Sequence, residues 1–487
     1  MGCFDQERIH HTLIFENLLE KIEYLEYKKQ NNIELEDISN NSKNVKDSDI
    51  FVAVAGNLSD GHKYISDAIK NGAKTIVYQN DIDFEDGINY IKVSNSRKAL
   101  SDISNILEDY PSKKMTVIGV TGTNGKTTTA TTIYYLMKEI YGSASNIGTD
   151  GTFIGDERTD NANTTPDIYL LNKIFNKSLD AGIDKLVLEA SSHGLVQNRL
   201  NGIDFDYGIF TNLSTEHLDY HKTMDNYFDA KMILFKNAKN KIVNIDDPYG
   251  KKAKERFSDA VSFGLGEDAD YRAIDISKND LTTDFTLNGV DFTINSIADY
   301  EVYNKLAAIV TLNLMGASLE QIAEKLRAFK GLPSRFEYVE NDLGKNIIID
   351  FAHTPRAFEA IFESIPKEAN TIAVFGINGD RNADFRRLIG NACAKNNVFA
   401  VVTTDDPKFQ TYEQIRDEIV VGIDELGGEY EAIKDRKEAM TYAIRKANKG
   451  DYILMLGKGE EHFMKLNGNE KTPYNEYETV LKAIAAQ

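Results

Sequence analysis

The sequence predicts an α/β protein of three domains, on the basis of its strand pattern and one glycine-rich loop. Short apolar runs of strand character alternate with helical patterns along most of the chain, which is typical of layered α/β domains. Residues 119–130 (GVTGTNGKTTTA) directly follow the apolar run 115–118 and have the composition of a phosphate-binding loop. The chain has 487 residues, too many for a single hydrophobic core.

The apolar runs fall into three series, and each series predicts one sheet. The first holds residues 50–56 and 74–78 and ends near the turn-forming residues 110–114. The second begins at residue 115, includes 185–190, 207–213 and 241–247, and closes with the helical stretch 303–316 and residues 331–339. The third comprises residues 346–354, 371–380, 398–407 and 451–459. We therefore expect domains at 1–112, 113–336 and 337–487, with polar motifs just after the strands, where open parallel sheets bind ligands.

The composition argues against several classes of function. The net charge is −20, and the sequence contains no basic stretch with interleaved aromatic residues of the kind that displaces counterions from a nucleic acid. We therefore expect no nucleic-acid partner. No apolar run approaches the ~18 residues of a membrane span, and the first residues lack a signal-peptide pattern. Cys3 and Cys393 are the only cysteines, which suits a reducing compartment. We expect a cytoplasmic protein without membrane insertion, and a monomer.

The glycine-rich loop departs from the strict phosphate-loop pattern at one position. That pattern requires a glycine, four residues and then Gly-Lys-Ser/Thr, whereas the first position here is Val120. We expect Lys126 to neutralise phosphate oxygens and the Thr127 hydroxyl to bind Mg²⁺. The residues expected to surround the phosphates are Gly122, Thr123, Asn124, Gly125, Lys126, Thr127 and Thr128. The alternative is an ordinary glycine turn at the start of a helix.

A second group of polar residues follows the next strands of the same series. Glu189 comes directly after an apolar strand and could hold Mg²⁺, which prefers oxygen ligands. Five of the eight histidines occur in motifs at or beyond strand ends, namely His193, His217, His221, His353 and His462. A lone histidine is usually structural, but this concentration makes a functional role more credible. Physical reasoning alone places Lys231 on the surface of an amphipathic helix.

These motifs resemble those of the Mur ligase family, the cytoplasmic enzymes that build the peptide of bacterial cell-wall precursors. The loop TGTNGKTT resembles the ATP loop of that family, although folylpolyglutamate synthases have a related loop. Residues 190–199 (ASSHGLVQNR), 212–221 (NLSTEHLDYH) and 230–235 (AKMILF) resemble the central domain of the members that add the third amino acid to UDP-N-acetylmuramoyl-L-Ala-D-Glu. The resemblance covers nearly the whole chain. It implies a three-domain architecture with a Rossmann-like C-terminal domain, and ATP and Mg²⁺ as cofactors.

The resemblance also implies catalytic roles in the central domain. Lys231 is expected to be carbamylated, which converts its amine into a carboxylate that helps bind a second Mg²⁺. The expected metal ligands are Thr127, Glu189, His217 and Lys231, and Lys126 completes the catalytic set.

Contacts to the UDP-sugar peptide are also implied by the resemblance. Residues 163–167 (NTTPD) would by themselves be a turn and helix N-cap between helical stretches. The expected peptide and sugar contacts are Asn163, Thr164, Thr165, Ser191, Gln197 and Arg199, of which Arg199 can pair with a carboxylate or phosphate. Residues 41–43 read Asn-Ser-Lys where the family has Asp-Ser-Arg, so two of three uridine-segment positions differ. Ser42 and the turn Asn57, Leu58 and Ser59 are the expected uridine contacts.

In the C-terminal part, the resemblance implies nucleotide contacts by Asn304, Arg335 and Asp350. The amino-acid contacts would be Arg381, Asp405, Asp406, Pro407, Lys408, Gly457 and Glu461. Diaminopimelate-adding members have Asp-Asn-Pro-Arg where this chain has Asp405 to Lys408, and lysine-adding members have a non-basic last residue. Because Lys408 would repel the ammonium of L-lysine, meso-diaminopimelate is favoured and L-lysine remains possible. The alternative is that Lys408 points to solvent and selects nothing.

The activity implied is ATP-dependent amide-bond formation between UDP-N-acetylmuramoyl-L-Ala-D-Glu and a diamino acid through an acyl phosphate. Three alternative functions would each leave some of these motifs without a role. A folylpolyglutamate synthase would not need residues 40–64 or SSHGLVQNR, and a non-catalytic nucleotide-binding regulator of wall synthesis would not need Lys126, Glu189 and Lys231. A phosphate-loop switch or motor would not need substrate motifs in all three domains.

Overall fold

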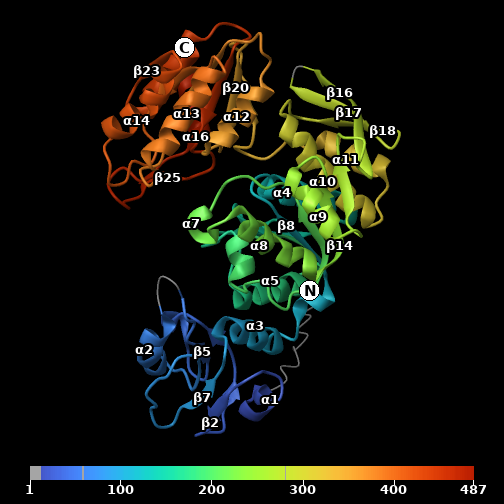
Figure 1. Ribbon diagram of the computed structural model, residues 1–487, viewed down its shortest axis with the longest axis vertical. Coiled ribbons are helices and arrows are strands. Elements are labelled where there is room, and N and C mark those ends of the chain that lie inside the picture. The colour runs from blue at the N-terminus through green and yellow to red at the C-terminus, as the bar shows by residue number, and fades with distance from the viewer. Residues whose placement is uncertain (1–12, 57–59, 280) are drawn as a thin grey trace, which may run out of the picture. The chain divides into compact units, whose positions relative to one another are not determined.

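The computed structural model describes residues 13–56, 60–279 and 281–487. The chain forms two compact units, one of residues 1–272 with 307–317 and one of residues 273–306 with 318–487. Helices and strands alternate in both units (Figure 1), so the predicted α/β class is confirmed. Among the described residues, no helix has the length and apolarity that crossing a membrane requires.

A five-stranded sheet organises the N-terminal part of the first unit, in the order β2-β7-β6-β5-β4. Its strands are parallel except for β2. Ile50, Phe51 and Val52 of β5 are fully buried, because a parallel strand covered on both faces is apolar throughout. The elements are β1 (Leu13–Ile14), α1 (Phe15–Leu19), β2 (Glu26–Lys28), β3 (Glu34–Leu35), β4 (Ile38–Ser39), β5 (Ile50–Val52), α2 (Ile65–Lys70), β6 (Thr75–Tyr78), β7 (Asn89–Lys92) and α3 (Ser96–Leu107).

The rest of the first unit is built on a larger mixed sheet, with the order β11-β10-β9-β12-β8-β13-β14-β15 and with β15 paired in parallel with Tyr271 and Arg272. The strands from β9 to β15 in that order are parallel, and β10 and β11 add an antiparallel edge. Its strands are β8 (Thr116–Thr121), β9 (Ser145–Gly148), β10 (Gly151–Ile154), β11 (Glu157–Thr159), β12 (Lys185–Glu189), β13 (Phe205–Phe210), β14 (Ala238–Asn244) and β15 (Val261–Gly264). Its helices are α4 (Lys126–Tyr141), α5 (Ile168–Asp180), α6 (Ser192–Val196), α7 (Leu218–His221), α8 (Met224–Asn237) and α9 (Pro248–Arg256). Because β8 lies between β12 and β13, the loops after these three strands meet at one sheet edge.

The second unit contains a six-stranded sheet in the order β19-β20-β24-β21-β22-β23, parallel except for β19. One apolar cluster on this sheet includes Phe358, Ile389 and Ile415, and another includes Met440 and Val480. Helices therefore cover both faces, as expected of a Rossmann-like domain. The elements are β19 (Glu337–Val339), β20 (Asn346–Asp350), α12 (Pro355–Ser364), β21 (Thr371–Phe375), α13 (Ala383–Lys395), β22 (Phe399–Val402), α14 (Tyr412–Glu425), β23 (Tyr430–Ala432), α15 (Arg436–Lys446), β24 (Tyr452–Leu456), β25 (Phe463–Met464), β26 (Thr472–Pro473) and α16 (Glu476–Ile484).

The same unit has an antiparallel section that precedes the six-stranded sheet in sequence. It comprises β16 (Tyr271–Asn279), β17 (Thr282–Leu287) and β18 (Val290–Ile294), followed by α11 (Leu319–Ala328). Helix α10 (Asp299–Leu314) matches the helical stretch expected at 303–316. The domain boundaries expected near 113 and 337 remain predictions.

One local expectation was wrong. Residues 163–167 do not lie between two helical stretches, because the antiparallel pair β10 and β11 precedes them and α5 follows. Asp167 occupies the N-cap position of α5, but its side chain makes no cap hydrogen bond. Its carboxylate instead lies 3.3 Å from Nε of Arg199, which draws it away from the helix amides.

Candidate active site

The glycine-rich loop connects β8 to α4 and has the backbone shape of a phosphate-binding loop. Gly122 has φ +153° and Gly125 has φ +83°, both outside the range that most side chains tolerate. A Cβ on Gly122 would also lie 1.9 Å from Oγ1 of Thr211. Val120, at the position where the strict pattern has glycine, is fully buried within β8. The departure therefore lies in the strand, and the turn itself keeps the glycines that it needs.

Lys126 begins α4 and bends back over this loop. Its Nζ donates to the carbonyl oxygens of Gly122 at 3.0 Å and Thr123 at 2.9 Å. The ammonium thus lies at the N-terminus of a 16-residue helix, where backbone N–H groups and the helix dipole also favour an anion. This arrangement favours the phosphate-site interpretation over a simple helix-capping turn.

Glu189, at the end of β12, presents a buried carboxylate beside the loop. Its side chain accepts hydrogen bonds from the backbone N–H of Thr149 at 2.9 Å and the Thr149 hydroxyl at 3.2 Å. Burial raises the pKa of Glu189, while the charge of Lys126 and hydrogen bonds from Thr149 and Thr127 act in the opposite direction. The Thr127 hydroxyl and the Glu189 carboxylate therefore lie together next to a cation. These hard oxygen donors fit Mg²⁺.

Lys231, on α8, is buried, so the expectation of a surface lysine was wrong. Only 1% of the residue is exposed, and Nζ donates to the Gly122 carbonyl at 2.7 Å. Nζ also lies 4.5 Å from the centre of the Tyr227 ring. Burial, assisted by the nearby charge of Lys126, lowers the pKa of Lys231 well below its usual value. A low pKa favours the neutral amine, which is the nucleophilic form that carbamylation requires.

Three of the five highlighted histidines form a cluster beside Lys231. The ring of His193 lies 5.0 Å from that of His217 and 5.5 Å from that of His221. His221 is buried, stacks on Tyr227 at 4.9 Å, and its Nε2 lies 2.9 Å from the Ser192 hydroxyl. The side chain of His217 is 45% exposed, so it can reach a ligand from solvent. His217 therefore fits the proposed metal-ligand role better than the buried His221.

The buried position of His221 predicts a pH-dependent stability. Burial lowers the pKa of His221 from 6.5 to about 4, so the unfolded chain takes up this proton at a higher pH than the folded protein does. We expect the stabilising contribution of neutral His221 to be complete above pH 6.5 and to be lost as pH falls towards 4. Urea unfolding midpoints across this range should fall less steeply for His221→Gln than for wild type. Parallel slopes for the two proteins would contradict this assignment.

The residues expected to contact the substrate peptide come together around Glu189. The Thr165 hydroxyl donates to the Glu189 carbonyl at 2.7 Å and lies 2.9 Å from the Ser191 hydroxyl. Arg199 donates to the Thr165 carbonyl at 2.8 Å and to the side chain of Gln197 at 2.9 Å. This network joins the loop before α5 to the start of α6.

The remaining predicted substrate residues are distributed as follows. The Thr164 hydroxyl lies 3.1 Å from that of Thr149, and Asn163 is exposed. Ser42 is buried in a short 3₁₀ turn, where its carbonyl accepts a hydrogen bond from Asn71. The predicted contacts Asn57, Leu58 and Ser59 lie outside the described residues.

Of the predicted nucleotide contacts of the second unit, Asn304 and Asp350 are buried and Arg335 is partly exposed. Asp350 accepts hydrogen bonds from the backbone N–H groups of Phe336 and Ala352, both at 2.7 Å. Burial raises the pKa of Asp350 to about 6, against the opposing charge of Arg335. On α10, Asn304 donates to Glu301 at 3.0 Å, and the charge of Glu301 also acts on Asp350.

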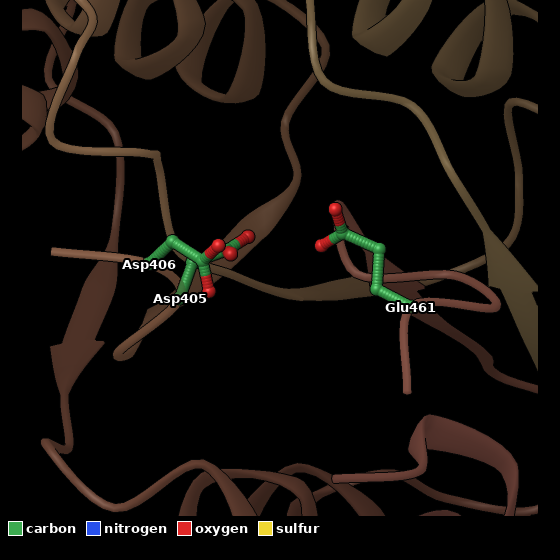
Figure 2. Close-up of side chains that lie close together, drawn as sticks. All are labelled: Asp405, Asp406 and Glu461. Atoms are coloured by element: carbon green, nitrogen blue, oxygen red, sulfur yellow. The ribbon is translucent and has the colours of Figure 1, made fainter. Parts of the chain in front are cut away.

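Four of the predicted amino-acid contacts line a cavity of about 220 Å³ in the second unit, whereas Asp406, Pro407 and Lys408 are not among its lining residues. Its lining residues include Phe351, His353, Asn378, Arg381, Asp405, Gly457 and Glu461. Figure 2 shows the carboxylates of Asp405 and Asp406 on one segment and that of Glu461 facing them from another.

Sequence reasoning missed Lys458, which lies at the centre of these acids. Its side chain is fully buried, with Nζ at 2.7 Å from Asp406, 2.6 Å from Glu461 and 3.6 Å from Asp405. The position of Lys458 between two glycines of GKGEE was the available signal. Because the Lys458 ammonium already pairs with all three carboxylates, we describe this cluster as an ion-pair network rather than a cation site.

Lys408 is held by an ion pair with Asp380 instead of extending into solvent. Its ammonium bonds to the Asp380 carboxylate, and only 14% of the side chain is exposed. The backbone N–H of Lys408 donates to the Lys465 carbonyl at 3.1 Å. The solvent-pointing alternative is therefore not what the structure shows.

The architecture and the loop, carboxylate and buried lysine together define the Mur ligase family, and the chain belongs to it. Residues 120–312 match the Mur ligase middle domain, and residues 334–459 match the Mur ligase glutamate ligase domain. Among its relatives is the UDP-N-acetylmuramoyl-L-alanyl-D-glutamate–2,6-diaminopimelate ligase of Clostridium perfringens, 35% identical over 96% of this chain and 99% of the relative. The ligase of the same name from Clostridium tetani is 36% identical over 96% of this chain and 98% of that protein.

A solved structure supports the same family assignment. A UDP-N-acetylmuramoyl-L-alanyl-D-glutamate–2,6-diaminopimelate ligase superimposes with a TM-score of 0.68 at 27% identity, covering 93% of this chain and 95% of the other. The predicted Mur ligase fold is thereby confirmed.

Proposed function

We propose that this protein is the ATP-dependent ligase that adds the third amino acid to UDP-N-acetylmuramoyl-L-Ala-D-Glu in peptidoglycan synthesis. One observation carries the proposal: Lys126 and Lys231 both donate to the Gly122 carbonyl of the phosphate loop. A switch or motor has no evident need for the second, buried lysine. The similarity of nearly the whole chain to ligases of this name supports the substrate assignment.

The reaction joins a carboxylate to an amine at the expense of ATP. The D-Glu side-chain carboxylate attacks the γ-phosphorus and releases ADP, and the resulting acyl phosphate is attacked by the α-amine of the amino acid. That amine loses a proton, inorganic phosphate leaves with the C–O bond electrons, and an amide remains. Phosphorylation is necessary because a carboxylate has no adequate leaving group. No nucleophile of the protein is consumed.

The residues of the loop stabilise the charge that develops during phosphoryl transfer. The N-terminal N–H groups of α4 and the Lys126 ammonium face the phosphate oxygens. Mg²⁺, when bound, neutralises further phosphate charge, and we assign its ligands to Thr127, Glu189, His217 and carbamylated Lys231. Arg199 and Thr165 orient the substrate peptide from the neighbouring network.

For the third amino acid, we propose meso-diaminopimelate rather than L-lysine. The cavity offers Arg381 for a carboxylate and Glu461 for an ammonium. Lys408 does not line the cavity but pairs with Asp380, the residue before Arg381. Its cation would attract the distal carboxylate of diaminopimelate and repel an additional ammonium. Asp380 neutralises part of that charge, so the selectivity depends on Lys408 exchanging partners when the amino acid binds.

The direct test supplies UDP-N-acetylmuramoyl-L-Ala-D-Glu, ATP and Mg²⁺ with separate amino acids and follows phosphate release and the joined product. We expect product with meso-diaminopimelate and much less with L-lysine, and the reverse preference would overturn the choice of amino acid. ATP cleavage without a joined product from any amino acid would overturn the function. A folate substrate with glutamate tests the folylpolyglutamate alternative, and nucleotide binding without turnover would favour the non-catalytic regulator.

Replacing Lys408 should change selectivity more than turnover. We expect Lys408→Ala to raise KM for meso-diaminopimelate about tenfold or more, since a charge-assisted hydrogen bond contributes about 1.5–3 kcal/mol. The KM for L-lysine should change little or fall, and Lys408→Arg should retain diaminopimelate use. Lys434→Ala, which removes an exposed lysine paired with Glu413 in the same unit, is the control. An equal effect of Lys408→Ala on both amino acids would contradict a selective role.

A further inference from the structure

Arg386 is a fully buried arginine behind the amino-acid cavity that no motif identified. It lies on α13, and its guanidinium reaches two separate turns and one neighbouring helix. Burying a guanidinium is costly unless its donors find partners. Both Nη atoms of Arg386 have partners, whereas its buried Nε has none, so the contacts of the two Nη atoms indicate a specific task. The identities of those partners indicate what the task is.

The partners of Arg386 belong to the turns that carry the amino-acid contacts. Nη2 donates to the carbonyl oxygens of Asn378 at 3.1 Å and Gly379 at 3.0 Å, both in the turn after β21. The same nitrogen donates to Oε1 of Gln410 at 2.6 Å, beyond β22. Nη1 donates to the Glu418 carboxylate on α14. One guanidinium therefore joins Asn378 and Gly379 to Gln410, whose backbone N–H in turn donates to the Pro407 carbonyl at 2.9 Å.

These two turns also contact each other so closely that their spacing is sensitive to small changes. The backbone N–H of Gly379 donates to the Asp406 carbonyl at 2.8 Å. A Cβ on Gly379 would lie 2.1 Å from the Pro407 carbonyl oxygen. On the outer side, Asp380 pairs with Lys408. The first turn carries Arg381 and the second follows Asp405, both of which line the cavity.

We propose that Arg386 is a positioning residue for the incoming amino acid, fixing the spacing between the turn with Arg381 and the turn with Asp405 to Lys408. The identity of the ligand in this inference rests on the proposed function. The link that Arg386 makes between the two turns is independent of that function. A planar guanidinium suits this role because its donors point in fixed directions, which a lysine cannot reproduce.

The packing of α13 against α14 does not by itself require a buried arginine at position 386. Helices α13 and α14 already pack through buried residues including Ile389, Ile415 and Ile419. A Cβ on Gly390 would lie 2.1 Å from the Ile419 carbonyl, so the two helices are in close backbone contact. Glu418 is partly exposed and can be solvated if its partner is removed. The fold can therefore survive the loss of Arg386 while the turns lose their link.

The experiment compares Arg386→Met and Arg386→Lys with Arg387→Met in the full-length protein. Arg387 is the adjacent residue and pairs with Glu425 on the same two helices, so it controls for loss of an inter-helix ion pair. We expect both Arg386 variants to raise KM for the amino acid about tenfold or more, because misplacement of a binding group by about 1 Å can cost as much as 10²-fold. The kcat and the KM values for ATP and the UDP-linked dipeptide should stay within about threefold, and Arg387→Met should match wild type.

Amide hydrogen exchange gives a readout that does not depend on turnover. We expect faster exchange in residues 376–381 and 405–410 of the Arg386 variants, with the strands of the sheet unchanged. Gln410→Ala removes only the contact to the second turn, and it should raise KM for the amino acid in the same direction. The effects of Gln410→Ala and Arg386→Met should be less than additive, since both break one link.

The possible outcomes distinguish a failure of the proposed function from a failure of the positioning role of Arg386. A wild-type protein that joins no amino acid to the precursor overturns the proposed function, and hydrogen exchange still tests the alignment role. Unchanged exchange in both turns, or an unchanged KM for the amino acid in folded Arg386 variants, overturns the inference. A uniform loss of kcat and thermal stability in Arg386→Met, without a specific KM change in Arg386→Lys or Gln410→Ala, also overturns it.

Discussion

Lys231→Ala should lower kcat by about 10²- to 10³-fold, because loss of a metal ligand removes several kcal/mol of transition-state stabilisation. The native side chain is buried at the phosphate loop, and its lowered pKa favours the neutral amine that reacts with CO₂. The carbamate that forms carries a negative charge opposite to that of a lysine. In the proposed mechanism, Lys126 and Mg²⁺, when bound, would compensate this charge.

Three measurements test this result. Added short carboxylates such as formate or acetate should restore part of the activity of Lys231→Ala, because they can occupy the space of the carbamate. Wild type supplied with ¹³C-bicarbonate should show a carbamate signal by NMR that the variant lacks. Lys236→Ala, which removes an exposed lysine from the same helix, should retain full activity. Full turnover by folded Lys231→Ala would remove the carbamate from the mechanism.

The fold was largely predictable because apolar runs and glycine turns are local features of the chain. The runs 50–56, 74–78, 185–190 and 371–380 became β5, β6, β12 and β21 with their following turns. Residues 163–167 were misplaced because the short exposed strand β11 has no apolar alternation to distinguish it from a loop. The capping role of Asp167 failed for a non-local reason, since its partner Arg199 is distant in the sequence.

The site residues that could be predicted were likewise those whose evidence is local in the sequence. Lys126 and Glu189 were identifiable because Glu189 ends one strand and Lys126 follows the loop after the neighbouring strand, and parallel strands bring those ends together. The burial of Lys231 depends on where α8 packs, which periodicity alone did not reveal. Lys458 and Arg386 were missed because their partners come from separate segments of the chain. The resemblance to a family indicated which roles the residues could have, whereas the folded structure showed which residues each of them contacts.

Lys126→Met should lower kcat by about 10²- to 10³-fold, as expected when a donor to developing charge is removed from a preorganised site. The ammonium lies over the loop carbonyls at the start of α4. In the proposed mechanism it would face the phosphate oxygens that gain charge during transfer. ADP binding, measured by calorimetry, should weaken less than kcat falls, because the stabilisation is greatest in the transition state. Lys138→Met, at the exposed end of the same helix, is the control.

The same substitution tests how the two lysines are coupled. The positive charge of Lys126 lowers the pKa of Lys231, so its removal should raise that pKa and reduce the fraction of neutral amine at a given pH. We therefore expect Lys126→Met to need more bicarbonate than wild type to reach the same ¹³C-carbamate signal, with the difference diminishing as pH rises. An identical bicarbonate dependence in the two proteins would mean that burial alone sets the reactivity of Lys231. The phosphate loop would then use Lys126 only for phosphate binding and transfer, and the modification of Lys231 would be independent of it.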